Sequence, residues 1–200
     1  MKILCSTTLL SALAVLALTG CDSSSDEVMT TPATAAPDAA AATAKVGAAG
    51  SGCELPVSFG VADGWKPKQV TVEAGDPLAA LAKKGPFTMA CEIDAKPAGN
   101  IGFLRVWTGE QAELKAGLTA FIGDKAQDPT FTEAQIGGKP GLSVDYQQKS
   151  QLDDSVEKES AFAVDTGKGL VVVSLDSFDS GEHAEMLPAY QLARNSLAVN

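Results

Sequence analysis

The sequence is short of the residues from which metal sites and many catalytic sites are built. Its 200 residues include one histidine, four cysteines, two tryptophans and two tyrosines. A structural zinc site needs about four cysteine or histidine ligands at regular spacing, and His183 stands far along the chain from the cysteines. The chain has no Gly-x-Ser-x-Gly nucleophile elbow, and its Gly137-Gly138-Lys139 run lacks phosphate-loop spacing. We therefore expect no metal, no cofactor and no enzymatic activity.

Positive charge is also scarce. The chain has 15 Lys and Arg residues against 25 Asp and Glu residues, a formal net charge of −10. An acidic surface repels the phosphates of nucleic acids and anionic lipid head groups. We therefore expect neither as a ligand. The acidic excess lies from Val106 onward, and we interpret it as a solvated face, with a docking face for a basic partner as the alternative.

No hydrophobic run is long enough for a comfortable membrane span. The apolar stretch from Ile3 to Leu18 is shorter than the roughly 20 residues that a spanning helix needs. It suits the core of a signal peptide, because it follows the charged start Met1-Lys2. An uncleaved helical anchor is the alternative interpretation.

The four residues Leu18-Thr19-Gly20-Cys21 follow this stretch and resemble a bacterial lipobox. The resemblance implies that a signal peptidase recognises Leu18, Thr19 and Gly20 and cuts before Cys21. It also implies a diacylglyceryl group on the cysteine, often with a further acyl chain such as palmitate on its amine. One acyl chain holds a protein to a bilayer only marginally, whereas two or three anchor it firmly.

Residues 21–52 are expected to form a lipidated, disordered linker. The segment from Asp22 to Gly52 is rich in Ala, Thr, Pro, Gly and Ser and has no aromatic residue. Such a composition cannot bury enough apolar surface to offset the entropy of ordering it. We therefore expect a signal peptide over 1–20, this linker, and a globular domain over 53–200. The domain would be held at the extracytoplasmic face of the cell membrane by the lipid on Cys21.

Two of the four cysteines are left for the domain. Cys5 would be lost with the signal peptide, and Cys21 would carry the lipid, which leaves Cys53 and Cys91. Thiols of exported proteins tend to oxidise. We predict a Cys53–Cys91 disulfide, with two separately buried thiols as the alternative.

Hydrophobic periodicity predicts a domain that contains both strands and helices. Alternating apolar residues are typical of half-buried strands, and an apolar residue every three or four positions indicates a helix. Strands are expected at 53–61, 68–72, 87–93, 101–107, 131–136, 142–147, 156–164 and 170–175. Helices are expected after Asp76-Pro77, after a capping box at Thr108–Gln111, and after Asp179-Ser180.

Several positions within these elements carry specific expectations. The short helix after Asp76 should turn Leu78, Leu81 and Ala82 toward the core. Strand 101–107 should be central, because it has apolar residues on both faces. Arg105 should pack its stem along neighbouring rings and keep its head in water.

One resemblance follows from the order of these elements. Phe59-x-Val61-x-x-Gly64-Trp65 precedes a turn, and Gly138-Lys139-Pro140 precedes a strand that ends at Tyr146. With the late hairpin and terminal helix, this resembles the PsbP-like fold and small actinobacterial lipoproteins of the LpqN type. The resemblance implies an α+β fold, an α/β/α sandwich in which helices flank a largely antiparallel sheet. It also implies binding or assembly roles, and it supplies no catalytic residue. Many members have proline before the turn, where this chain has Ala62.

We therefore expect a membrane-anchored lipoprotein that displays a non-catalytic binding or assembly domain. Its partner would be a protein, a cell-wall component or a small apolar ligand. The alternative is an envelope hydrolase with an unrecognised site near His183. That residue is interpreted as a surface histidine of the last helix. The carboxylates of the preceding segment, Asp153, Asp154, Glu157 and Glu159, are interpreted as solvated charges.

Overall fold

The computed structural model describes residues 40–73, 75–76, 79–150 and 153–200. The predicted signal peptide, the lipobox at Leu18–Cys21 and the linker as far as residue 39 lie outside these residues. Within the described residues, no helix is both long enough and apolar enough to cross a membrane.

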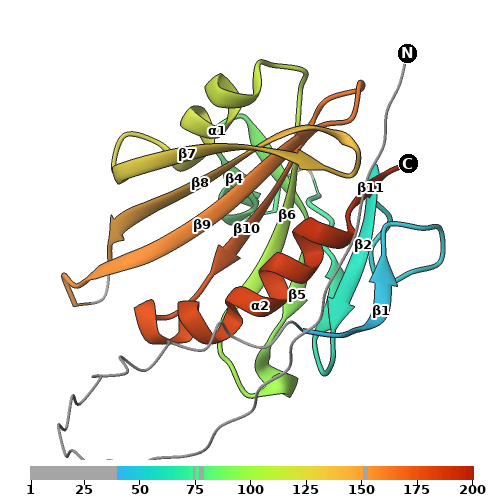
Figure 1. The fold of residues 1–200 in the computed structure, drawn as a ribbon, viewed down its shortest axis with the longest axis horizontal. Helices are drawn as coiled ribbons and strands as arrows, with labels where there is room; N and C mark the ends of the chain where they lie inside the picture. The colour runs from blue at the N-terminus through green and yellow to red at the C-terminus, as the bar shows by residue number, and fades with distance from the viewer. Residues whose placement is uncertain (1–39, 74, 77–78, 151–152) are drawn as a thin grey trace, which may run out of the picture. The chain divides into compact units, whose positions relative to one another are not determined.

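An eight-stranded antiparallel sheet organises the described residues (Figure 1). Its strands lie in the order β3-β5-β6-β10-β9-β8-β7, and β4 pairs with β5. The strands are β3 (Lys66–Gln69), β4 (Lys83–Lys84), β5 (Phe87–Asp94), β6 (Phe103–Gly109), β7 (Gln127–Ile136), β8 (Lys139–Lys149), β9 (Val156–Asp165) and β10 (Leu170–Asp176). The predicted α+β class and the late hairpin are confirmed.

Helices and a small second sheet cover the two faces of the large sheet. The second sheet has the order β1-β2-β11. It lies with helix α2 on one face, and helix α1 packs on the other face, against β8, β9 and β10. These elements are β1 (Ala42–Val46), β2 (Val57–Ala62), α1 (Leu114–Ile122), α2 (Ser180–Ser196) and β11 (Ala198–Val199). One outer layer is therefore part helix and part sheet.

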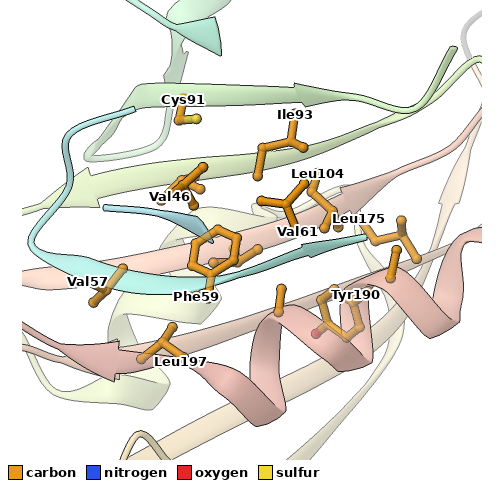
Figure 2. Packing of buried hydrophobic residues seen from close by; sticks show 14 of the residues in the cluster. Val46, Val57, Phe59, Val61, Cys91, Ile93, Leu104, Leu175, Tyr190 and Leu197 are labelled. Carbon is orange, nitrogen blue, oxygen red and sulfur yellow. The ribbon is translucent and has the colours of Figure 1, made fainter. Parts of the chain in front are cut away.

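The larger core cluster lies between β2, α2 and the central sheet (Figure 2). Alternate residues of β2, including Val57, Phe59 and Val61, are buried, as their spacing predicts. They contact Tyr190 of α2 and Leu197, the residue directly after α2. Both of these residues are also buried. The closing helix, which is predicted after Asp179-Ser180, thus covers the sheet through Tyr190 and its buried neighbours.

A smaller core cluster lies under α1. Phe121 of this helix makes edge-on contacts with Phe87 and Trp107, with ring centroids 5.6 and 5.5 Å apart. Leu118 and Ile122 are buried beside it. Trp107 donates its indole N–H to Ser174 Oγ at 3.0 Å, so the ring is a satisfied core residue.

The predicted disulfide is present. Cys53 precedes β2 and Cys91 lies in β5, with Cα atoms 5.9 Å apart and a sequence separation of 38. Both residues are buried. The bond therefore ties the segment before the small sheet to the central sheet.

The predicted boundary at residue 53 is wrong. Residues 42–46 were assigned to the linker, but they form β1 and pair with β2, with Ala42 opposite Ala62 and Val46 opposite Phe59. Val46 is fully buried. The segment has little apolar surface of its own, and it is ordered because it satisfies the free edge of β2 and inserts one valine into the core.

Two predicted helix starts are also corrected. The segment after Asp76 forms only a single 3₁₀ turn, η1 (Ala79–Ala82), before Lys83 and Lys84 pair with β5. Ala82 is buried, but Leu81 is 72% exposed, and Leu78 lies outside the described residues. So short a helix gains few hydrogen bonds for its nucleation cost, and the strand pairing is preferred.

The second correction concerns the start of α1. Thr108 lies within β6, so the expected capping box does not form. The cap is Glu113, whose carboxylate accepts hydrogen bonds from the N–H groups of Lys115 and Ala116. These bonds lower the pKa of the Glu113 carboxyl.

Candidate functional site

His183 is buried against the sheet, which corrects its interpretation as a surface residue. Its exposed fraction is 6%, and it lies in the first turn of α2, which is capped by Asp179. The inward stripe of this helix contains Leu187, Tyr190 and Ala193. Extending that stripe back by one turn from Leu187 reaches position 183, so the helix places the imidazole over β9.

The histidine is the end of a hydrogen-bonded chain of three side chains. Ser160 of β9 donates its hydroxyl proton to Asp145 Oδ1 of β8 at 2.6 Å. His183 Nε2 lies 3.0 Å from the same hydroxyl oxygen. Asp145 and Ser160 are opposite each other in the β8–β9 pairing. Two adjacent strands and the helix above them therefore assemble the group.

The direction of these bonds limits the chemistry of the group. A serine hydroxyl has one proton, and Ser160 gives it to Asp145. The imidazole must then donate its Nε2–H to Ser160, so it does not serve as the base for this hydroxyl. The side chain of Ser160 is also closed off, with 2% of the residue exposed. The arrangement contains the residue types of a catalytic triad, but not its bonding order.

Burial lowers the pKa of His183, against a smaller opposing effect of the Asp145 charge. The positive charge of Lys158 lowers this pKa further. The ring is therefore neutral at pH 7. It is a hydrogen-bond donor that holds Ser160, and through it the Asp145 carboxylate, in place.

A pocket of about 420 Å³ opens beside this group. Ser160 and His183 form part of its wall. Around them the lining is mainly polar or charged: Asp128, Thr130, Asp145, Tyr146, Gln147, Lys158 and Glu159, with Leu187 as the apolar exception. Asp145 and Asp128 are exposed. The pocket thus presents carboxylate acceptors and one lysine to a ligand.

A second polar group lies on the opposite face of the sheet. Arg105 Nε is 2.9 Å from Glu92 Oε1, and its Nη1 is 2.7 Å from Asp176 Oδ2. Its guanidinium also lies 4.7 Å from the centre of the Phe103 ring. The ring contact agrees with prediction, but the head is held by two carboxylates and does not lie free in water. Burial opposes the charge of Arg105, and the two carboxylates outweigh burial and raise its pKa.

Glu159 extends this second group toward β9. It is partly buried, and burial together with the nearby Asp176 charge raises its pKa to about 8. Lys84 opposes this rise, and its Nζ donates to the Tyr146 hydroxyl at 3.4 Å. The prediction that Glu159 is a solvated surface charge is therefore wrong. Within the described residues, no three His, Cys, Asp or Glu side chains gather to hold a metal ion.

Sequence reasoning found one member of the buried group and missed two. His183 was considered as a site residue, but Asp145 and Ser160 were read only as residues on or near strands. Their spacing carries no motif, because β8 and β9 are joined through residues that contribute nothing to the site. Only the strand register brings Asp145 and Ser160 together, and the sequence carries no signal of that register.

Solved structures with a similar fold include the following two. Cyanobacterial PsbP (CyanoP) from Synechocystis is 14% identical, with 78% of this chain and 92% of that chain covered and a TM-score of 0.49. LpqN of Mycobacterium tuberculosis, a protein involved in cell envelope biogenesis, is 12% identical, with 78% and 90% covered and a TM-score of 0.41. Both likenesses concern the fold alone and say nothing about function.

Sequence comparison identifies the family of the chain. No curated protein matches it. A family described as uncharacterised lipoprotein matches residues 23–197, which takes in nearly all of the chain after Cys21. The protein therefore belongs to this family of uncharacterised lipoproteins.

Proposed function

We propose that the protein is a lipid-anchored, extracytoplasmic binding protein of the bacterial envelope, without catalytic activity. The lipoprotein family match and the lipobox at Leu18–Cys21 support the anchor. The observation that carries the non-catalytic role is the state of Ser160. Its hydroxyl is buried and is committed to Asp145. It is neither accessible to a substrate nor bonded to a base in the order that a hydrolase needs.

The carboxylates in the wall of the pocket beside His183 support a ligand that carries hydrogen-bond donors. Most of its lining side chains carry charges or hydrogen-bonding groups. The exposed carboxylates of Asp128 and Asp145 favour a ligand that presents amine or hydroxyl donors. A fragment of the cell wall that carries amino groups, such as a short peptide or an amino sugar, has this chemistry.

Binding is tested by titrating soluble cell-wall fragments into the protein and following amide chemical shifts. We expect shifts at Asp145, Lys158 and His183, and a loss of affinity of about tenfold in Asp145→Asn, since a charged hydrogen bond contributes about 1.5–3 kcal/mol. Asp63→Asn is the matched control, because Asp63 is exposed in the turn after β2. Equal affinities for the two variants would contradict the assignment of the pocket.

The hydrolase alternative rests on the presence of Ser160, Asp145 and His183 in one group. A fluorophosphonate probe labels serines that are activated as nucleophiles. We expect no labelling of the wild-type protein. Labelling that disappears in Ser160→Ala would establish the alternative and overturn the non-catalytic proposal.

A further inference from the structure

Exposed apolar side chains gather at one end of the central sheet. Among the described residues, four large hydrophobic residues are strongly exposed. Three of them lie at or just beyond the ends of strands that are neighbours in the sheet: Ile101 before β6, Phe178 after β10, and Val156 at the start of β9. The fourth, Leu81, precedes β4, which pairs with the opposite end of β5.

The strand register brings two of these residues together. Phe103 is opposite Asp176 in the β6–β10 pairing, so Ile101 and Phe178 each stand two residues beyond the last pair. Glu182 of α2 holds both segments. Its carboxylate accepts hydrogen bonds from the N–H groups of Ile101 and Gly102, and from that of Phe178 at 2.5 Å. Ile101 and Phe178, which are both 54% exposed, are therefore held in place through their backbone by the Glu182 carboxylate.

The chain enters the domain at the same end. β1 begins with Ala42 opposite Ala62, the last residue of β2. The turn that follows packs Gly64 against Ala98 of η2 (Lys96–Ala98), and Ile101 comes three residues later. Figure 1 shows the start of β1 and the start of α2 at the lower end of the view, beside the turn between β5 and β6.

From this placement we infer that the end of the domain bearing Ile101, Phe178 and Val156 rests on the bilayer that carries the Cys21 lipid. The inference depends on the proposed lipid anchor. About 20 residues separate Cys21 from Ala40, and the coil that their composition predicts would have a reach of roughly 25 Å. A tether of this length keeps the end near the membrane at a millimolar effective concentration. A contact by a few apolar side chains, too weak for a free protein, is then populated.

The net charge of the protein decides which lipid head groups it can contact. The net charge of −10 disfavours an anionic surface, so the contact is with neutral, zwitterionic head groups. Phe178 and Ile101 would lie at the boundary between head groups and acyl chains, as aromatic and aliphatic side chains of peripheral proteins do.

The test uses the full-length lipidated protein in phosphatidylcholine vesicles whose acyl chains are brominated. Bromine quenches tryptophan at short range. The two native tryptophans, Trp65 and Trp107, are buried and give a constant background. Phe178→Trp and Ile101→Trp place the probe in the apolar end, and Leu81→Trp is the matched control at an exposed leucine near the other end.

We expect the added emission of Phe178→Trp and Ile101→Trp to be quenched at least threefold more than that of Leu81→Trp. Equal quenching in the three variants would overturn the inference. So would a blue shift of Phe178→Trp that depends on protein concentration and not on vesicles, because a second copy would then cover this end. Failure of the protein to float with the vesicles would instead contradict the lipid anchor itself.

Discussion

Burial decides the protonation state of two side chains on opposite faces of the sheet, His183 and Glu159. Each is kept neutral by its surroundings near pH 7, but their effects on stability run in opposite directions with pH. The pKa of His183 is lowered, so the stability that its neutral form gives the folded protein is lost in acid. The pKa of Glu159 is raised to about 8, so the stability that its protonated form gives the folded protein is lost in base.

Glu159→Gln removes a carboxyl whose charged form is disfavoured in the folded state. The folded protein holds this proton up to about pH 8, compared with 4.5 for an ordinary glutamate. Wild-type stability therefore falls as pH rises between these values. We expect the variant to be more stable than the wild type by about 2 kcal/mol at pH 8.5 and about equal to it at pH 4.5. Urea unfolding at both pH values measures this.

The control for this prediction is Glu133→Gln, a change at an exposed glutamate of β7. It should alter the free energy of unfolding by less than about 0.5 kcal/mol at either pH. A gain in Glu159→Gln that is equal at pH 4.5 and pH 8.5 would show that Glu159 is not buried as the structure has it.

His183→Gln keeps an N–H donor near Ser160 but cannot take up a proton. Because the pKa of His183 in the folded state is below its ordinary 6.5, the wild type loses stability as pH falls below 6.5 while the variant does not. We expect the difference in unfolding free energy between them to change by about 1 kcal/mol between pH 7 and pH 5, in favour of the variant. A difference that is the same at both pH values would exclude a buried neutral histidine.

For single residues of the site, burial can be predicted from the sequence, but contacts between strands cannot. The burial of His183 follows from helical periodicity once the stripe from Leu187 is continued backward. The contact of His183 with Ser160 and Asp145 does not, because it depends on which strands are neighbours and on their register. Likewise, Glu159 alternates with buried residues of β9, and the sequence does not show that Asp176 and Arg105 lie near it.

At the scale of elements, the small sheet includes β1, whose amino-acid sequence gives little sign that it forms a strand. β1 contributes one fully buried side chain, Val46, and otherwise exposed residues. Val46→Ala should lower the free energy of unfolding by about 1–2 kcal/mol, since it deletes two buried methyl groups. Chemical denaturation measures the loss. Lys45→Ala, at the exposed neighbouring position, should have almost no effect. Equal losses of unfolding free energy in the two variants would mean that residues 42–46 belong to the linker and not to the folded domain.

The disulfide acts between elements. Joining Cys53 to Cys91 closes a loop of 38 residues, for which the chain-entropy argument gives about 4 kcal/mol. We expect the double variant Cys53→Ala, Cys91→Ala to lose about 3–4 kcal/mol in urea unfolding, and the wild type with reductant to behave in the same way. Unchanged stability of the double variant would mean that the bond does not constrain the unfolded chain.

The elements that could be predicted are those whose pattern is long and regular. The hairpin of β9 and β10, strand β5 and the closing helix all follow from periodicity and turn residues. The predictions that failed concern short segments. Residues 79–84, the start of α1 and β1 each take their conformation from a neighbouring strand, because local preferences over four or five residues are too weak to decide.

At the scale of the whole molecule, the two ends of the central sheet differ in character. The end where the chain enters carries Ile101, Phe178 and Val156, whereas Leu81 lies toward the other end. The pocket beside His183 is lined by β7, β8, β9 and the first turns of α2, and its residues Lys158 and His183 lie near the end that carries Val156 and Phe178.

The anchor is the claim on which the location, the orientation and the role all depend. It is tested most directly by the intact mass of the mature protein isolated from the membranes of its own bacterium. The account predicts a chain of residues 21–200 that carries two or three acyl chains on Cys21 and is absent from membranes in Cys21→Ala. A mature chain without lipid, or one that still begins at Met1, would contradict it.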